Sequence, residues 1–112
     1  MILAIVGSRG ITDYSLIVNA LQKHSPAEII TGGAVGVDEL AANYANENGI
    51  ELTVYQPDYS KFGKQATHIR NQKIVDHCTH LIAFWDGRSA GTKSSIEKAK
   101  KKNKEVTIVL VK

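Results

Sequence analysis

The sequence predicts an α/β fold, an open parallel sheet of five strands between two layers of helices. Three observations predict it. Five apolar runs recur along the chain, segments with helical apolar periodicity separate them, and the connecting loops are short. Strict alternation of strands and helices is typical of parallel sheets. The chain has 112 residues, too few for a barrel of eight such units, which needs about 250. We therefore expect one domain spanning residues 1–112.

Three of the five predicted strands are apolar almost throughout: Ile2–Val6, His80–Trp85 and Val106–Val111. Near-continuous apolar runs suit parallel strands that are covered on both faces. The other two predicted strands are Glu28–Thr31 and Ile50–Tyr55. Right-handed crossovers leave two common strand orders, 3-2-1-4-5 and 2-1-3-4-5, and the composition does not choose between them.

Four segments between these runs carry a helical apolar pattern. They are Tyr14–His24 with Thr12 or Asp13 as N-cap, Val37–Asn48 ending at Gly49, Ala66 to about Asp76, and Lys93–Lys102. The segment Gln56–Gln65 has no clear pattern and connects the third strand to the third helix. Loops of this length in small domains are often functional.

Composition excludes several classes of protein. The one cysteine, Cys78, excludes a disulfide framework, and 43% hydrophobic residues with a net charge of +3 argue against a disordered chain. No apolar run reaches the roughly 18 residues of a membrane span. The sequence starts directly on the apolar run Met1–Val6, with no basic n-region and no cleavage site, so we interpret this run as a buried strand rather than a signal peptide. We expect a soluble cytoplasmic protein.

The positive charge is concentrated near the end of the chain. Residues 98–104 hold five of the 14 basic residues, and the remaining nine face 11 acidic ones, so the rest of the chain carries −2. Lysines at a helix C-terminus are favourable by themselves. The functional alternative is contact with a nucleic-acid backbone, although no aromatic residues are interleaved with these lysines.

Seven of the nine glycines lie in three loops that follow predicted strands: residues 7–10, 31–38 and 86–92. Ligands of open α/β sheets bind beyond the carboxyl ends of the strands. Glycine lets the backbone approach a ligand, and free N–H groups at a helix start favour an anion. We therefore predict a phosphate or carboxylate pocket formed by three loops. The glycine spacing matches neither the dinucleotide-binding fingerprint nor the phosphate loop of nucleotide hydrolases.

The order of these motifs resembles the SLOG superfamily, and within it the small YspA-like, DUF2493-type domains. The motifs are Gly-Ser-Arg at 7–9, Gly-Gly-Ala-x-Gly-x-Asp at 32–38, Arg70-Asn71, Ala-Phe-Trp-Asp-Gly at 83–87 and Ser-x-Gly-Thr at 89–92. The resemblance runs from about Ile2 to Val111. It implies a Rossmann-like sheet with strand order 3-2-1-4-5 that binds a nucleotide or an ADP-ribose-like ligand, and it suggests a homodimer or a higher homo-oligomer.

Fifteen residues are predicted to bind that ligand, partly from the loops and partly from the resemblance. They are Gly7, Ser8, Arg9, Gly32, Gly33, Ala34, Gly36, Asp38, Arg70, Asn71, Asp86, Gly87, Ser89, Gly91 and Thr92. Arg9 is expected to pair with a phosphate or to form an ion pair with Asp38 or Asp86. Arg70, placed at the start of a helix, is expected to face an anion, because a cation is unfavourable there.

The resemblance also implies a difference from the LOG enzymes of the superfamily. Those phosphoribohydrolases carry Gly-Thr-x-x-Glu, and here Ser95 takes the place of the glutamate. Glu97 lies about 200° further round the helix. We therefore favour a module that senses or sequesters a nucleotide-derived molecule. The alternatives are a nucleotide hydrolase using Asp38, Asp86 or Glu97, and a DNA-binding module like the domain of DprA.

Four further features are weaker candidates. Trp85 and Tyr59 are candidates for stacking on a base, and His68 is a candidate for pocket chemistry near Arg70. Residues His77, Cys78 and His80 have no second ligand pair at metal-binding spacing. We expect no metal or other cofactor, and no association with a membrane.

Overall fold

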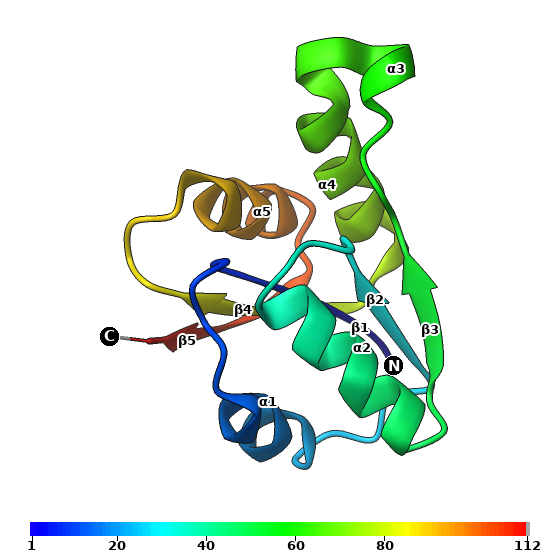
Figure 1. Ribbon diagram of the computed structural model, residues 1–112, viewed down its shortest axis with the longest axis vertical. Coiled ribbons are helices and arrows are strands. Elements are labelled where there is room, and N and C mark those ends of the chain that lie inside the picture. Colours follow the sequence, from blue (N-terminus) through cyan, green and yellow to red (C-terminus); the bar gives the residue numbers. More distant parts are fainter. Residues whose placement is uncertain (112) are drawn as a thin grey trace.

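The computed structural model describes residues 1–111 and confirms the α/β fold with a parallel five-stranded sheet (Figure 1). Lys112, the last residue of the expected domain, lies outside the described residues. The strands are β1 (Ile2–Gly7), β2 (Glu28–Thr31), β3 (Glu51–Val54), β4 (His80–Trp85) and β5 (Glu105–Leu110). Their order is β3-β2-β1-β4-β5. It is one of the two orders that the residues left open and the one that the resemblance implied.

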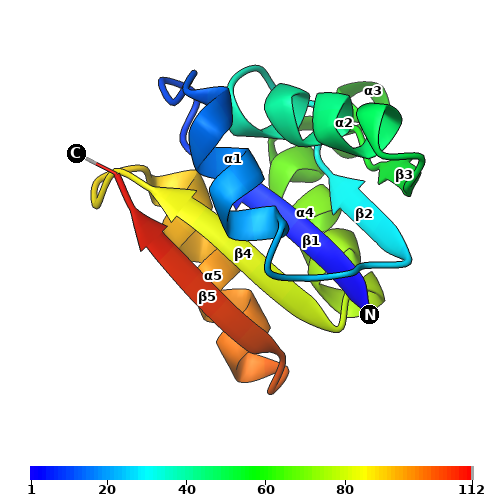
Figure 2. The ribbon, with the colours of Figure 1, turned by 90° about the horizontal axis from the view of Figure 1, so that it is seen from below.

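The central strands β1 and β4 explain the continuous apolar runs. Four of the six residues of each strand are buried. Leu3 and Ile5 face α1 (Tyr14–Leu21) and α2 (Val37–Glu47), whereas Ala4 and Val6 face α4 (Ala66–His77) and α5 (Ala90–Lys101). Figure 2 shows α1 on one side of the sheet and α5 on the other. Because both faces are covered, the four buried residues of each strand are apolar whichever face they point to.

Several element ends differ from the sequence predictions. Helix α1 ends at Leu21, not His24, and α2 ends at Glu47, one residue early. Helix α5 begins at Ala90, three residues before the predicted Lys93, because Gly91 is accommodated inside the first turn. Strand β3 ends at Val54. The longest helices of residues 1–111 have 12 residues, and no helix in this range is long and apolar enough to cross a membrane.

The segment Gln56–Gln65 is not a plain loop. It contains α3 (Tyr59–Phe62) and the 3-10 helix η1 (Gly63–Gln65), which runs directly into α4. Asp58 caps α3, since its carboxylate accepts hydrogen bonds from the Lys61 N–H (3.1 Å) and the Ser60 hydroxyl (2.8 Å). A capping residue, not apolar periodicity, starts this helix. Figure 1 shows α3 and the beginning of α4 projecting beyond the sheet.

Candidate functional site

A pocket of about 260 Å³ lies at the carboxyl edge of the sheet, between α4 and α5. The ends of β1 and β2 form its floor, and the first turns of α5 and the first three turns of α4 form its walls. The residues that line it are Val6, Gly7, Arg9, Gly32, Ala34, Asp38, Thr67, Arg70, Asn71, Ile74, Ser89, Gly91, Thr92 and Ser95. The pocket thus brings together the three glycine loops that the sequence placed at one edge.

Asp38 holds the loop after β2 in place from the first turn of α2. Its Oδ2 atom accepts hydrogen bonds from the backbone N–H groups of Gly32 (3.0 Å) and Ala34 (3.2 Å). The residue is only 8% exposed, and burial raises the pKa of its carboxyl, although the two backbone hydrogen bonds and nearby Arg70 oppose the shift. Its Oδ1 atom accepts no hydrogen bond from residues 1–111, which leaves an acceptor at the pocket wall.

Arg70 reaches across the pocket floor from the second turn of α4. Its Nη1 donates to the backbone carbonyl of Gly32 (2.5 Å) and more weakly to that of Tyr55 (3.4 Å), and its Nε donates to the Asn71 side chain (2.7 Å). Burial lowers the pKa of the guanidinium despite the Asp38 charge. The Nη2 atom donates to no group of the described chain, so it is available to an anion.

The prediction that Arg70 starts its helix is wrong. It is the fifth residue of α4, because α4 begins at Ala66. The unfavourable dipole at a helix start therefore does not account for this arginine. Carbonyl oxygens and the Asn71 amide hold its guanidinium instead, and the absence of a side chain at Gly32 makes the approach possible. A Cβ on Gly32 would lie 2.6 Å from Nη1.

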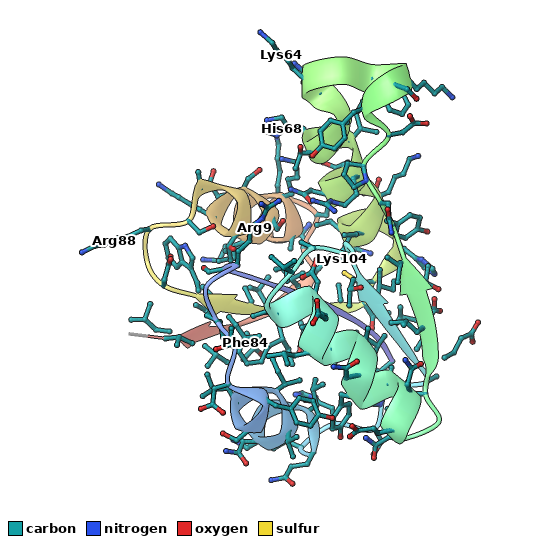
Figure 3. All side chains as sticks on the ribbon, in the orientation of Figure 1. Arg9, Lys64, His68, Phe84, Arg88 and Lys104 are labelled. Atoms are coloured by element: carbon teal, nitrogen blue, oxygen red, sulfur yellow. The ribbon has the colours of Figure 1, made fainter. Side chains whose placement is uncertain are left out.

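Arg9 is the exposed cation of the pocket. It lines the cavity with Gly7, and it forms no ion pair with Asp38 or Asp86 within residues 1–111, contrary to one of the two expectations. Figure 3 shows its side chain reaching from the loop after β1 toward α5. The backbone of Arg9 packs closely against Gly36, because a Cβ on Gly36 would lie 2.5 Å from the Arg9 carbonyl oxygen.

Helix α5 points its N-terminus at the pocket, and no side chain caps the N–H groups of its first turn. Ser89 occupies the N-cap position but accepts no capping hydrogen bond, and the first turn contains no acidic residue. The hydroxyls of Ser89 and Thr92 lie 3.3 Å apart at the same place. By contrast, Asp13 caps α1 through the Ser15 N–H. Free N–H groups, two hydroxyls and the helix dipole together favour an anion at the start of α5.

Ten of the fifteen predicted residues line this pocket, and five do not. Ser8 and Asp86 line a second cavity of about 420 Å³ on the α1 side of the sheet. There the Asp86 N–H donates to the Ser8 hydroxyl (3.3 Å), and the Asp86 carboxylate accepts from the backbone N–H groups of Arg88 and Ser89 (2.8 Å each). These hydrogen bonds, first of all the one from Ser89, lower the pKa of Asp86.

The glycines among these five residues line neither cavity. They are Gly33, Gly36 and Gly87, and all three have positive φ angles. Gly36 lets the loops after β1 and β2 touch, because the Arg9 carbonyl occupies the space of a side chain. Their positions indicate a role in shaping the loops. The predicted contact of these three glycines with a ligand stays a prediction, because none of them lines a cavity.

Three pocket residues were not among the candidates: Val6, Thr67 and Ile74. Ser95, noted only as the replacement of a glutamate, also lines the pocket, whereas Glu97 is exposed and does not. Thr67 and Ile74 share one face of α4 with Arg70 and Asn71 at the spacing i, i+3, i+4, i+7. Once Arg70 is assigned to the pocket, this spacing predicts that Thr67 and Ile74 line it as well.

The remaining candidates lie outside the pocket. Trp85 donates its indole N–H to the Ser89 carbonyl (3.0 Å) and so anchors the loop before α5. Tyr59 is 60% exposed on α3, and the labelled His68 points away from the sheet in Figure 3. His77 contacts Tyr55 and Glu28, and His80 pairs with Glu105.

No group of three His, Cys, Asp or Glu side chains within residues 1–111 is placed to hold a metal ion. The lysines of residues 98–104 follow the other end of α5, near the amino edge of the sheet (Figure 1). Helix α5 has 12 residues, so this end lies roughly 15 Å from the pocket. The lysines are not part of the pocket.

Comparison with protein families gives one match. The family described as "YspA, cpYpsA-related SLOG family" (YAcAr) matches residues 1–62, which is more than half of the chain. The matched part includes β1, β2 and α2, and therefore the loops that carry Arg9, Gly32 and Asp38. A search of curated proteins gives no match.

Proposed function

Because the chain belongs to the YspA, cpYpsA-related SLOG family, we propose that it binds a nucleotide-derived small molecule in the pocket between α4 and α5. Membership of this family fits a nucleotide-related function in general. The more specific proposal is that the pocket holds the phosphoribosyl part of the molecule and does not cleave it. The protein would then act as a sensor or as a sequestering module.

One observation carries this proposal: cationic and hydroxyl donors line the same small pocket as an uncommitted carboxylate oxygen. Arg9, the Ser89 and Thr92 hydroxyls and the free N–H groups of α5 suit a phosphate. The free Oδ1 of Asp38 suits a ribose hydroxyl, because carboxylates accept hydrogen bonds from ribose in many nucleotide sites. The two kinds of group therefore match the two polar ends of a phosphoribosyl unit.

The size of the pocket limits what it encloses. Its volume of about 260 Å³ is below the roughly 300–1,000 Å³ of pockets that enclose drug-sized ligands. A phosphoribosyl group suits this volume, and a base or a second ribosyl phosphate would extend past the rim. We therefore expect a nucleoside monophosphate and ADP-ribose to bind through the same unit.

The arrangement of carboxylates favours binding over hydrolysis. Asp38 has one oxygen engaged by two loop amides, Ser95 stands on the α5 wall, and Glu97 is exposed outside the pocket. No second carboxylate lines the cavity in the described part of the chain to act with Asp38 as an acid–base pair. Incubation with ligand followed by chromatography tests this. Released base or phosphate would contradict the non-hydrolytic part of the proposal.

Differential scanning fluorimetry and calorimetry test binding. The panel is ribose 5-phosphate, AMP, 2′-deoxy-AMP, ADP-ribose and unphosphorylated adenosine. At a free concentration of a hundred times Kd, a ligand raises Tm by about 10 °C. We expect the phosphorylated ribosides to do so and adenosine to have no effect. If no member of the panel shifts Tm, the proposed function is wrong.

The chain supplies a matched pair of variants for this experiment. Arg9→Gln removes a pocket cation that makes no ion pair within residues 1–111, so Kd should rise about 10- to 100-fold without loss of stability. Arg88→Gln removes an exposed cation that points away from the body in Figure 3 and does not line the pocket. It should leave Kd unchanged. Equal losses in both variants would indicate only general charge attraction.

A further inference from the structure

Strand β5 forms one edge of the sheet, and its outer side is bare. It pairs with β4 over all six of its residues, Glu105 to Leu110. Figure 2 shows β5 at the border of the sheet, and within residues 1–111 no strand pairs with it on the other side. An edge strand exposes backbone donors and acceptors that another strand can bind.

One hydrogen bond fixes which residues face outward. The Val111 N–H donates to the Trp85 carbonyl (2.8 Å). In a parallel pair, alternate residues direct both N–H and C=O to the neighbouring strand. Thr107 and Val109 therefore share the direction of Val111 and bond to β4. The backbone groups of Val106, Ile108 and Leu110 point away from the sheet.

Two of these three residues, Ile108 and Leu110, carry apolar side chains that the fold leaves largely uncovered, whereas Val106 is half-buried against the core. Ile108 is 41% exposed and Leu110 is 59% exposed, on the face that carries α5. Residues 106–111 contain no charge and no proline. Natural edge strands are usually protected by lysine, proline, a bulge or a covering segment. Beyond Glu105 at its first position, strand β5 has none of these protections among the described residues, so its edge is suited to another strand.

We propose that β5 pairs with β5 of a second copy of this chain, antiparallel, about a two-fold axis at Ile108. The register then sets Ile108 opposite Ile108 of the second copy, and Val106 opposite its Leu110. All three outward-facing residues of each strand become hydrogen-bonded pairs. The two five-stranded sheets join into one, and the exposed Ile108 and Leu110 side chains contact their apolar counterparts.

A second copy fits this edge better than an unrelated strand because the edge is self-complementary. Directly opposed residues of an antiparallel pair point to the same face. The axis at Ile108 therefore keeps both α5 helices on one face of the joined sheet. The two Glu105 residues are then about 20 Å apart along the strands, and the lysine-rich ends of α5 are also at opposite ends. No like charges meet at the axis.

This interface is independent of the proposed function. None of the residues that line the pocket belongs to β5, and the pocket lies between α5 and α4 rather than beside the sheet edge. Dimer formation therefore leaves the pocket open. Loss of the interface and loss of ligand binding can be measured separately.

Sedimentation equilibrium of the full chain tests the proposal. We expect twice the chain mass of 12.2 kDa. Ile108→Lys sets two cations against each other at the axis and should raise the dimer dissociation constant roughly a hundredfold. Thr107→Lys is the matched control, with the same charge on the same strand but with backbone groups directed to β4. It should change the constant by less than about threefold.

Cysteine cross-linking tests the register even where a lysine variant fails to fold. In the proposed pairing, the Cα atoms of residue 108 in the two copies are about 5.5 Å apart, within disulfide range. Ile108→Cys should therefore cross-link with diamide as oxidant. Thr107→Cys should not, because its two copies are roughly 8 Å apart. The native Cys78 is buried. A monomeric wild type, equal effects of the two lysine variants, or cross-linking of Thr107→Cys alone would each overturn the proposal.

Discussion

The substitution Gly32→Ala tests how the pocket is built. A Cβ at this position would lie 2.6 Å from Arg70 Nη1, 2.9 Å from Asp38 Oδ2 and 3.0 Å from Arg70 Cζ. All three atoms are at the ends of side chains that can move. The backbone of Gly32 has no positive φ, so alanine adds no backbone strain there. The expected result is a folded protein whose Arg70 and Asp38 are displaced from their positions in the pocket.

The size of the effect follows from the hydrogen bonds that must give way. They are the bond from Arg70 Nη1 to the Gly32 carbonyl and the bond from the Gly32 N–H to Asp38 Oδ2. A hydrogen bond to a charged group contributes about 1.5–3 kcal/mol. Water replaces part of this at half-buried Arg70. We expect a loss of about 1.5–3 kcal/mol in the free energy of unfolding, or roughly 6–12 °C in Tm.

Calorimetric titration and thermal unfolding of the same preparations measure both consequences. Kd for a nucleoside monophosphate should rise at least about tenfold, because the site loses the placement of a cation and of a carboxylate. Gly10→Ala is the control, since no atom lies within 4 Å of its added Cβ, and it should change neither quantity. If Gly32→Ala lowers Tm but binds ligand as tightly as the wild type, Arg70 and Asp38 do not form the site.

Three further predictions concern stability. Folding raises the pKa of Asp38, so the wild type loses stability as pH rises from about 4, the ordinary pKa of aspartate, through the raised pKa. Asp38→Asn lacks this titration and should therefore gain stability relative to the wild type over that range. Urea unfolding across pH measures the difference. Asp86→Ala should act in the opposite sense. Because folding lowers the pKa of Asp86, its ionised carboxylate stabilises the wild type at pH values above the ordinary pKa of aspartate, so the variant should be less stable than the wild type at neutral pH and equally stable in acid. Ser89→Ala keeps the backbone N–H that donates to Asp86 and serves as the control. Gly7→Ala should lower the free energy of unfolding by about 3 kcal/mol or more in a chemical denaturation series, because its Cβ would lie 2.5 Å from Val37 Cγ2 in the core; wild-type stability in this variant would contradict the tight packing.

The fold was predictable from sequence because its central strands are covered on both faces. That burial leaves a continuous apolar run at β1 and another at β4, and such runs can be seen without a structure. The strand order was not determined by the same patterns, since it depends on which neighbours each crossover reaches. Helix α3 was missed for a different reason: four residues with one capping aspartate, Asp58, bury no apolar stripe.

The candidate site was predictable only in part, and Arg70 shows why. Its presence near the glycine loops could be expected, but its partners are carbonyls of Gly32 and Tyr55, residues 38 and 15 positions away. Backbone carbonyls have no sequence signature. The helix face that contains Thr67 and Ile74 could be assigned only once the direction of Arg70 was known. Conversely, the ion pair considered for Arg9 does not form, because the side chain extends over the pocket.

The glycines of the three loops have two different roles that spacing alone cannot separate. At Gly36 an added side chain would meet the backbone of Arg9, and at Gly7 it would meet Val37 in the core. Those atoms cannot withdraw, so these glycines are required for the segments to pack. At Gly32 the added atom would meet the charged ends of Arg70 and Asp38, which can withdraw at the expense of their positions in the pocket. The space beside Gly32 is therefore filled by charged groups that line the candidate pocket, whereas the space beside Gly36 and Gly7 is filled by backbone and core.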